Sequence, residues 1–403
     1  MTDKGKAWAV AAAVIVAGIV LAINRFKVPP ILPVLMDELQ VDMVVGGWLT
    51  SGSSVAGIFL AIPVAFLLAR IGLKATGLVA LGCAVAGAVI GGVAATAPVM
   101  LLGRMIEGVS VSLITVLAPT AISLWFAPRD RGLPMGIWAA WLPIGIVVVF
   151  NAAHPLMNAL GWRSLWWFGA VLDLLAFVLV GLVVASPPED GAGKKRPSAP
   201  PGELARMLLN PTTWLLAFSF AAFGFALLAY NTWAPTYLIE TLRVEPGAAS
   251  FYASLMFLAA IPANIVAGWV MDRMKDRYSL LPAAFLITTI LFFWSFRLGS
   301  VGVVVPYMIV LGLASNFIPT VTFTLAPETM PRIEYAGLSV GMVMAGTNVG
   351  GVSGPPALGA ILSAGNWSVG GTCFFLVMSL GTLAAWHVAR RLRAGRTEGS
   401  GGA

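Results

Sequence analysis

Two cations and three prolines interrupt the first hydrophobic stretch of this chain. Arg25 and Lys27 stand beside Pro29, Pro30 and Pro33, where a plain membrane span would carry only apolar side chains. Charge at membrane depth is costly, and it usually faces a water-filled cavity. A guanidinium presents five donors in a fixed geometry and can bind a carboxylate, phosphate or nitrate through two of them. These residue types therefore predict a path for a small anion, with Arg25 as the leading ligand.

Asn24 and Lys27 are the other candidate solute ligands in this stretch. Lys27 is two positions after Arg25, about 200° around a regular helix, so both cations face one cavity only if the prolines distort the turn. The alternative is that Arg25 lies near the outer interface, about 27 Å of helix beyond Ala7, with its head group in water.

Two acids are embedded in the apolar segments, Glu107 and Asp173. Glu107 follows Arg104 by three residues, so the two side chains share one helix face and can neutralise each other. The same pair could instead switch with protonation and couple transport to protons. Both interpretations stay open, and Glu107 is the leading coupling candidate, followed by Asp173.

Further polar and aromatic residues lie in segments that we expect to line the solute path. Each of them could equally join two helices. Tyr230 and Asn231 are the strongest, because their segment corresponds to the first one in an internal repeat. The full set is Trp138, Trp141, Tyr230, Asn231, Tyr252, Asn316 and Asn348.

The composition predicts an integral membrane protein. Of the 403 residues 59% are hydrophobic and only 10% are charged, whereas a soluble domain needs about a quarter charged. The two cysteines have neither disulfide nor metal-site spacing, and no nucleophile motif or nucleotide-binding loop occurs. We therefore expect no enzyme activity, no catalytic residue, no metal and no cofactor. The amino terminus runs directly into an apolar segment, so we also expect no cleaved leader.

Apolar stretches long enough to cross a bilayer predict twelve helices. The expected spans are 7–36, 44–69, 76–96, 98–126, 134–157, 165–185, 212–237, 249–270, 279–296, 302–326, 336–361 and 369–389.

The basic residues predict the orientation of these spans. Of the 24 Lys and Arg residues, only Arg163, Arg243 and Arg297 fall in the loops opposite the termini. Cytoplasmic loops are enriched in Lys and Arg. We therefore expect both termini in the cytoplasm and the protein in the inner or plasma membrane. Because topology accounts for the net charge of +7, we expect no nucleic-acid partner.

A segment rich in Pro, Gly and charge divides the spans into six and six. It occupies 186–211 and predicts a cytoplasmic linker between bundles 1–185 and 212–403. The halves echo each other, for example at Trp162 and Trp367. Repeated halves joined by a linker are typical of secondary transporters that hold their solute at the mid-membrane seam.

The loops between spans resemble those of the major facilitator superfamily over essentially the whole chain. Gly268-Trp-Val-Met-Asp272-Arg273-Met-Lys-Asp-Arg277 is similar to its G-x-L-x-D-R-x-G-R-K loop, and Arg104-Met-Ile-Glu107-Gly108 is similar to its R-x-x-Q-G motif. The loop at 65–74 keeps Arg70 but has Ala69 where the family usually has Asp. The resemblance implies an all-α fold of twelve transmembrane helices in two pseudo-symmetric bundles, acting as a monomer by rocker-switch alternating access.

The resemblance also suggests residues for gating. Asp272 and Arg273 could form a cytoplasmic latch with neighbouring helix ends, and Arg70 could take part. Gly346, Gly350 and Gly354 repeat every four residues before two prolines. This spacing lets helices approach closely and favours a gating helix.

The spacing of Arg25 and Pro33 resembles that of organophosphate and sugar-acid transporters, and a weaker likeness points to the cyanate and nitrate branch. The acids those transporters use are replaced here by Asn24 and Val111. The resemblance implies transport of a small anion, either an organic acid or an inorganic anion, coupled to protons or to a counter-anion. The alternative is a proton-driven exporter of drugs or metabolites with the same fold, and a receptor without transport ranks last.

Overall fold

Helices make up almost the whole described chain. The computed structural model describes residues 3–60, 63–127, 130–185, 206–274, 276–332 and 336–400, and these contain no β-strand. The chain divides into two compact units, Met1–Pro197 and Ser198–Ala403. Most of the expected linker lies outside the described residues.

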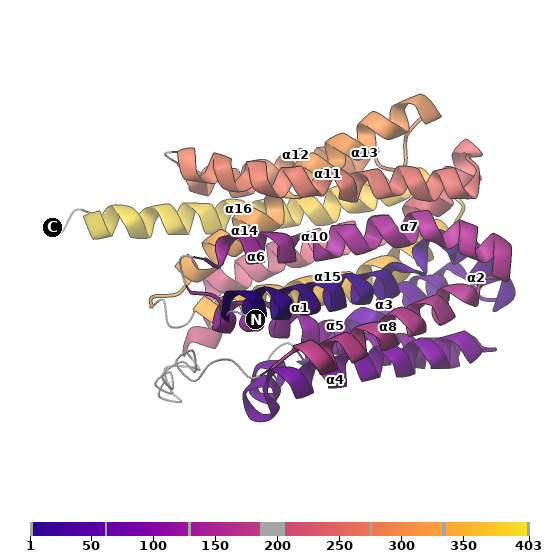
Figure 1. Cartoon of the computed structure of the whole chain (residues 1–403). Helices are drawn as coiled ribbons and strands as arrows, with labels where there is room; N and C mark the ends of the chain where they lie inside the picture. Colours follow the sequence, from indigo (N-terminus) through magenta and orange to yellow (C-terminus); the bar gives the residue numbers. More distant parts are fainter. Residues whose placement is uncertain are drawn as a thin grey trace. The chain divides into compact units, whose positions relative to one another are not determined.

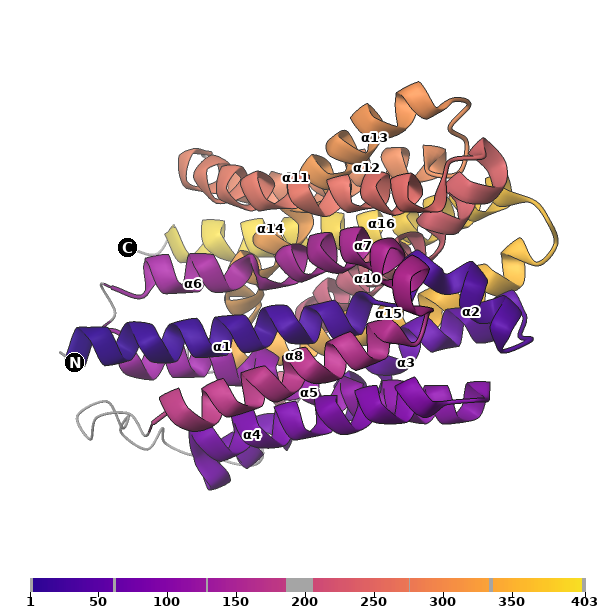
Figure 2. The same cartoon turned by 45° about the vertical axis from the view of Figure 1, so that its right-hand side comes forward.

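The first unit is built from long helices that lie side by side (Figures 1 and 2). Its elements are α1 (Asp3–Phe26), the 3-10 helix η1 (Pro29–Ile31), α2 (Leu32–Glu38), α3 (Met43–Leu60), α4 (Pro63–Val93), α5 (Ala97–Trp125), α6 (Gly132–Ala139), α7 (Trp141–Leu160) and α8 (Ser164–Val183).

The second unit has a similar all-helical make-up. Its elements are α10 (Pro211–Leu242), α11 (Pro246–Arg273), η3 (Arg277–Ser279), α12 (Leu280–Trp294), α13 (Val301–Ser315), α14 (Phe317–Leu325), η4 (Ala326–Thr329), α15 (Ala336–Leu362) and α16 (Trp367–Ser400).

Several expected spans are broken into pieces. The first comprises α1, η1 and α2, because Pro29 and Pro30 have no N–H to continue the helical hydrogen bonds. The fifth comprises α6 and α7, and the tenth comprises α13 and α14. Within α4 the chain turns at Gly72, whose φ of 79° suits glycine, and this turn separates the expected second and third spans.

Eleven helical segments of the described chain are long and apolar enough to cross a membrane. The expected span at 336–361 corresponds to α15, which is 27 residues long but is not among the eleven. Its many glycines, together with Thr347 and Asn348, reduce its hydropathy. The expected all-α architecture is confirmed, and the count of twelve spans is approximately right.

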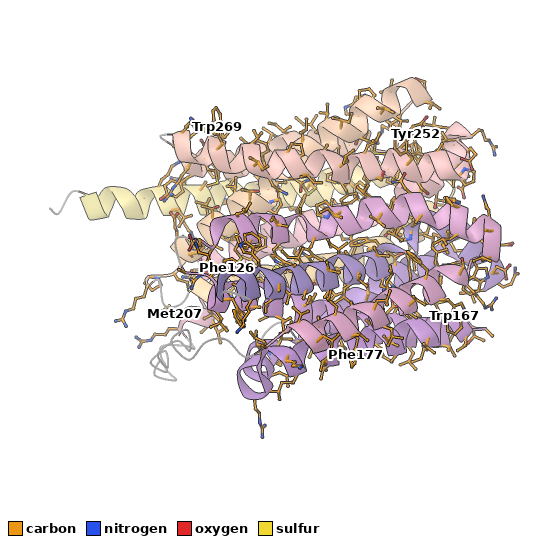
Figure 3. The ribbon with its side chains drawn as sticks, viewed as in Figure 1. Phe126, Trp167, Phe177, Met207, Tyr252 and Trp269 are labelled. Atoms are coloured by element: carbon orange, nitrogen blue, oxygen red, sulfur yellow. The ribbon has the colours of Figure 1, made fainter. Side chains whose placement is uncertain are left out.

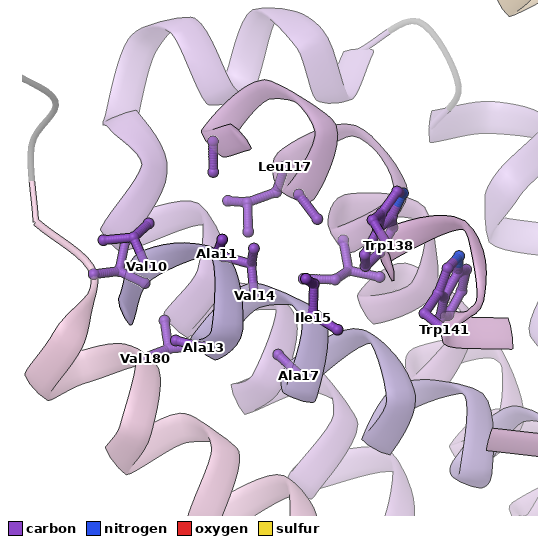
Figure 4. Packing of buried hydrophobic residues seen from close by; sticks show 14 of the residues in the cluster. Val10, Ala11, Ala13, Val14, Ile15, Ala17, Leu117, Trp138, Trp141 and Val180 are labelled. Carbon is purple, nitrogen blue, oxygen red and sulfur yellow. The ribbon is translucent and has the colours of Figure 1, made fainter. Parts of the chain in front are cut away.

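Small and apolar residues fill the interior of the first unit. α1 packs against α5, α7 and α8, and its Ala and Val side chains form one buried cluster with Trp138 and Trp141 (Figure 4). Large apolar side chains are exposed on outer faces instead, such as Trp167 on α8 and Trp269 on α11 (Figure 3). Such an exterior suits contact with lipid rather than water.

Candidate functional site

The end of α1 creates the site. α1 stops at Phe26, and its last carbonyl groups need donors from outside the helix. In a continued helix the carbonyl of Arg25 would accept from residue 29, but Pro29 has no N–H. The end of the helix therefore leaves the carbonyl groups of Asn24 and Arg25 to be satisfied by another part of the unit, and Pro29 removes the donor that Arg25 would have used.

Arg104 on α5 supplies these donors. Its Nη1 donates to the carbonyl of Asn24 at 2.8 Å, and its Nη2 donates to the carbonyl of Arg25 at 2.6 Å. Its Nε donates to the carbonyl of Leu49 on α3 at 3.1 Å, and Nη2 reaches Ser53 Oγ at 3.3 Å. The side chain is completely buried. The guanidinium thus ties α5 to α3 and to the end of α1.

Glu107 accepts from two cations at once. Its Oε2 bonds with Arg104 Nη1, as the three-residue spacing predicted, and its Oε1 lies 2.7 Å from Lys27 Nζ. Lys27 also donates to Asn24 Oδ1 at 2.9 Å, and its ammonium lies 4.8 Å from the ring centroid of Trp166. A buried ion pair persists only where further hydrogen bonds and contacts satisfy both charges, as they do here.

Asp173 on α8 joins this network through an amide. Asn24 Nδ2 donates to Asp173 Oδ2 at 2.9 Å and lies 3.4 Å from the carbonyl of Gly169. A side chain at Gly169 would collide with the Asn24 amide, so glycine makes the bridge possible. Asp173 Oδ1 is buried and has no hydrogen-bond partner among the described residues.

Arg25 differs from the other two cations. It is half-buried, and its Nη2 donates to Ser54 Oγ on α3 at 3.0 Å. Its Nε is buried without a partner, and among the described residues no carboxylate lies within ion-pair distance of it. Arg25 therefore keeps donor capacity and positive charge that the described residues leave unused.

The predicted ligands of the first span take different places. Lys27 is buried inside the first unit, with 1% of its surface exposed, and its ammonium donates hydrogen bonds to Glu107 and Asn24. Asn24 is equally buried and links Lys27 to Asp173. The helix break removes the geometric conflict between Arg25 and Lys27, since Lys27 no longer follows the regular turn of α1. Their roles in solute binding stay predictions.

Trp138 and Trp141 lie on either side of the break between α6 and α7. Their rings stack with centroids 5.0 Å apart and an angle of 6° between planes, and both belong to the buried cluster around α1 (Figure 4). Both are largely buried. The stack accounts for them as packing residues, and their assignment to the solute path is untested.

Two of the candidates on α10 lie in contrasting surroundings. Tyr230 packs against Phe292, Phe296 and Phe374, and its hydroxyl contacts Met308 Sδ at 3.4 Å. Its neighbour Asn231 is 3% exposed, and neither amide atom has a partner among the described residues. A buried amide without partners is uncommon, so Asn231 is the stronger ligand candidate of the two.

The remaining candidates of the second unit are spread over three helices. Tyr252 is half-buried beside Phe251 near the start of α11 (Figure 3). Asn316 stands between α13 and α14 and donates to the carbonyl of Gly312 at 2.9 Å. Asn348 is half-buried on α15. Among the described residues, no hydrogen bond or ring contact joins these three side chains to one another, and their roles also stay predictions.

The predicted latch and gating residues are only partly described. The side chain of Asp272 lies outside the described residues. The guanidinium carbon Cζ of Arg273 lies 4.1 Å from the centroid of the Trp269 ring. Arg70 is exposed. Gly346, Gly350 and Gly354 do form a packing stripe.

That stripe brings α15 against α10. A side chain at these glycines would overlap successive backbone carbonyls of α10, those of Ala217, Ala221 and Phe225. The close approach that the four-residue spacing predicts is therefore present. Whether α15 moves as a gate is not tested by this packing.

Sequence reasoning missed Ser53, Ser54 and Trp166, which contact the three cations. One signal was available: residues 50–54 read Thr-Ser-Gly-Ser-Ser within an otherwise apolar segment. Polar residues concentrated in one span often face other polar groups. For Trp166 the sequence held no such signal.

The fold, with its long apolar helices, is that of a multi-pass membrane protein. The sequence profile described as Major Facilitator Superfamily matches residues 14–332 and 238–402. The chain therefore belongs to the Major Facilitator Superfamily and is a membrane transporter, not an enzyme.

Two relatives illustrate the range of similarity. The chain is 31% identical over 171 residues to the uncharacterized MFS-type transporter YhcA of Bacillus subtilis, covering 41% of this chain and 32% of that protein. It is 27% identical over 288 residues to the 3-(3-hydroxy-phenyl)propionate transporter of Escherichia coli, covering 68% of this chain and 66% of the relative. The matched parts thus span a third to two thirds of the relatives' own lengths.

A solved structure supports the fold. The chain matches a bacterial homologue of the human lysosomal transporter Spinster, crystallised inward-facing and unoccupied, with a TM-score of 0.80. The match covers 96% of this chain and 97% of that one at 16% sequence identity. At this identity the likeness concerns the fold alone.

Proposed function

We propose that this protein is a secondary active transporter of a small anion, coupled to protons and working by rocker-switch alternating access. The solute class is a small organic acid, such as a monocarboxylate or sugar acid, or an inorganic anion. On this proposal the two six-helix halves rock about the solute in the inner or plasma membrane, with both termini in the cytoplasm and the protein acting as a monomer.

One observation carries the proposal: of the three cations near the end of α1, Arg25 is the one with no carboxylate partner among the described residues. Lys27 and Arg104 both bond with Glu107, whereas Arg25 contacts the neutral hydroxyl of Ser54 and keeps its Nε unbonded. A partly buried guanidinium with unbonded donors is a strong site for a carboxylate or other oxyanion. The relative named for 3-(3-hydroxyphenyl)propionate is consistent with an acid as solute, since a carboxylic acid is an anion at neutral pH.

Uptake into proteoliposomes tests the proposal. Four isotope-labelled anions would be compared: lactate, gluconate, nitrate and 3-(3-hydroxyphenyl)propionate, with a thermal-shift screen to extend the set. We expect at least one of them to be taken up. Arg25→Gln should abolish this uptake and Arg25→Lys should weaken it, because lysine keeps the charge but loses the planar two-donor geometry.

Arg390→Gln is the matched control, because Arg390 is an exposed arginine on α16 beside Trp386. It should leave uptake unchanged. If the wild-type protein moves only neutral or cationic solutes, the proposal is wrong. The alternative, a proton-driven exporter of drugs or metabolites, would then be tested by growth inhibition in a host that lacks efflux pumps.

A further inference from the structure

Glu107 and Asp173, the two buried carboxyl groups among the described residues of the first unit, have unequal surroundings. Glu107 has a cation at each oxygen, Lys27 at Oε1 and Arg104 at Oε2. The charge of a carboxylate held by two cations is compensated within the protein. As long as this arrangement persists, Glu107 is a fixed counter-ion.

Asp173 lacks that compensation. Its hydrogen bond comes from the neutral amide of Asn24, which donates to Oδ2, and its Oδ1 is buried with no donor among the described residues. The residue is completely buried. Taking a carboxylate charge out of water without a paired cation is costly, and such groups instead accept a proton. Because Asn24 occupies Oδ2, Oδ1 is the atom left for the proton.

The charges that act on Asp173 are few. Two charged side chains act on Asp173: Lys27, which follows α1, and Glu107 on α5. The Lys27 ammonium donates to Asn24 Oδ1, while the Nδ2 of the same amide donates to Asp173. α8 also packs against α4 and α7. The other titratable side chains described on those two helices are Arg70, Lys74, Cys83 and His154.

We propose that Asp173 carries the coupling proton, and that Glu107 stays ionised as the permanent partner of Lys27 and Arg104. This inference rests on the proposed function and reverses the order expected from the sequence, where Glu107 led. When Asp173 releases its proton, the O–H bond at Oδ1 breaks and the proton passes to water. The new carboxylate is then stabilised by the Asn24 amide and drawn toward the Lys27 ammonium.

The proton site can influence the anion site through electrostatics and through the main chain. The net charge of the buried cluster of Lys27, Arg104, Glu107 and Asp173 is more positive by one when Asp173 is protonated. An anion at Arg25 therefore binds better to the protonated form. Asn24, the partner of Asp173, is also the residue before Arg25. Arg104 holds both of their carbonyl groups, so a shift of Asn24 is passed to Arg25 directly. This linkage favours joint binding of proton and anion, which is symport.

The first test needs no solute. A protonated carboxyl group has an infrared C=O band that a carboxylate lacks. Infrared difference spectra of the purified full chain should show such a band at pH values above the range in which exposed Asp and Glu side chains titrate. Asp173→Asn should remove it, whereas Glu107→Gln should leave it. Glu240→Gln, which removes an acid from α10 in the other unit, is the control and should also leave the band.

The second test uses the four anions named above in proteoliposomes. With one proton per monovalent anion, a gradient of one pH unit can drive about tenfold accumulation. Asp173→Asn should reduce gradient-driven accumulation to the equilibrium level while keeping exchange of labelled for unlabelled anion. Arg25→Gln should abolish both exchange and accumulation yet keep the infrared band.

These two tests separate the two proposals. If none of the anions is transported, the proposed function fails, and the infrared titration still decides whether Asp173 takes a proton. If the band is absent, or disappears with Glu107→Gln and persists in Asp173→Asn, Asp173 is not the proton carrier. Accumulation by Asp173→Asn at the wild-type level would also overturn the inference.

Discussion

Arg104 donates a 2.6 Å hydrogen bond to the main-chain carbonyl of Arg25, so one arginine holds the backbone that carries the other. The two guanidinium groups have different tasks. Arg104 donates hydrogen bonds to carbonyl groups, to Ser53 and to Glu107, whereas Arg25 has an Nε–H with no hydrogen-bond partner among the described residues. The pair therefore combines a structural cation with one that is available to a solute.

Arg104→Lys should weaken anion transport although it conserves charge. Lysine has three donors on one nitrogen and cannot reach the carbonyls of Asn24, Arg25 and Leu49 together. Losing a hydrogen bond to a charged group costs about 1.5–3 kcal/mol, which corresponds to roughly a tenfold or larger fall in kcat/KM. Uptake kinetics in proteoliposomes would measure it. Unchanged kinetics in this variant would show that the clamp does not position Arg25.

Glu107→Gln should destabilise the first unit more than Asp173→Asn does. The first substitution leaves Lys27 and Arg104 buried without a carboxylate between them, which costs about 3–5 kcal/mol. The second removes a group that has no cation bonded to it. Thermal unfolding in detergent would rank the two variants. Equal losses would argue against Glu107 as the permanent counter-ion.

Adding Lys27→Met to Glu107→Gln should recover part of the lost stability. The double variant removes one of the two stranded cations, and the glutamine carbonyl can still accept from Arg104. We expect the double variant to unfold at a higher temperature than Glu107→Gln alone. Strictly additive losses would mean that Lys27 and Glu107 do not interact energetically.

Gly169→Ala should disturb the bridge between Asn24 and Asp173. The added Cβ would overlap the Asn24 amide, and overpacking of this kind costs about 1–3 kcal/mol. Gly136→Ala is the matched control in the same unit, because nothing lies within 4 Å of its Cβ position. That control should be neutral or slightly stabilising, since alanine favours helix. Thermal unfolding of the two variants measures this difference, and equal melting temperatures would contradict a tight contact at Gly169.

Gly350→Ala should separate α15 from α10. Its Cβ would overlap the carbonyl of Ala221, and at helix-backbone contacts the neighbour has little freedom to move. We expect a loss of about 1–3 kcal/mol, measured by thermal unfolding. Gly341→Ala on the same helix has open space at its Cβ and serves as the control. Similar melting temperatures for both variants would contradict a packing role for the glycine stripe.

The sequence by itself determined the class and much of the architecture. Long apolar stretches can satisfy their backbone in lipid only as helices, so composition and length were enough to predict the all-α fold. Local spacing predicted the Arg104–Glu107 pair and the glycine contacts of α15, because both depend on a single helix period. The proline-rich end of the first span indicated a break where charge would gather.

Only the tertiary structure decided which distant groups share charge. Lys27 and Glu107 are 80 positions apart, and Asn24 and Asp173 are 149 apart. Nothing in a helix period predicts such pairs, because they arise from the packing of α1 against α5 and α8. The same packing gives Glu107 two cations and Asp173 none, and it leaves Arg25 with unused donors. Charge compensation depends on which side chains are neighbours in space. The sequence therefore identified the charged residues but could not show which of them pair with one another.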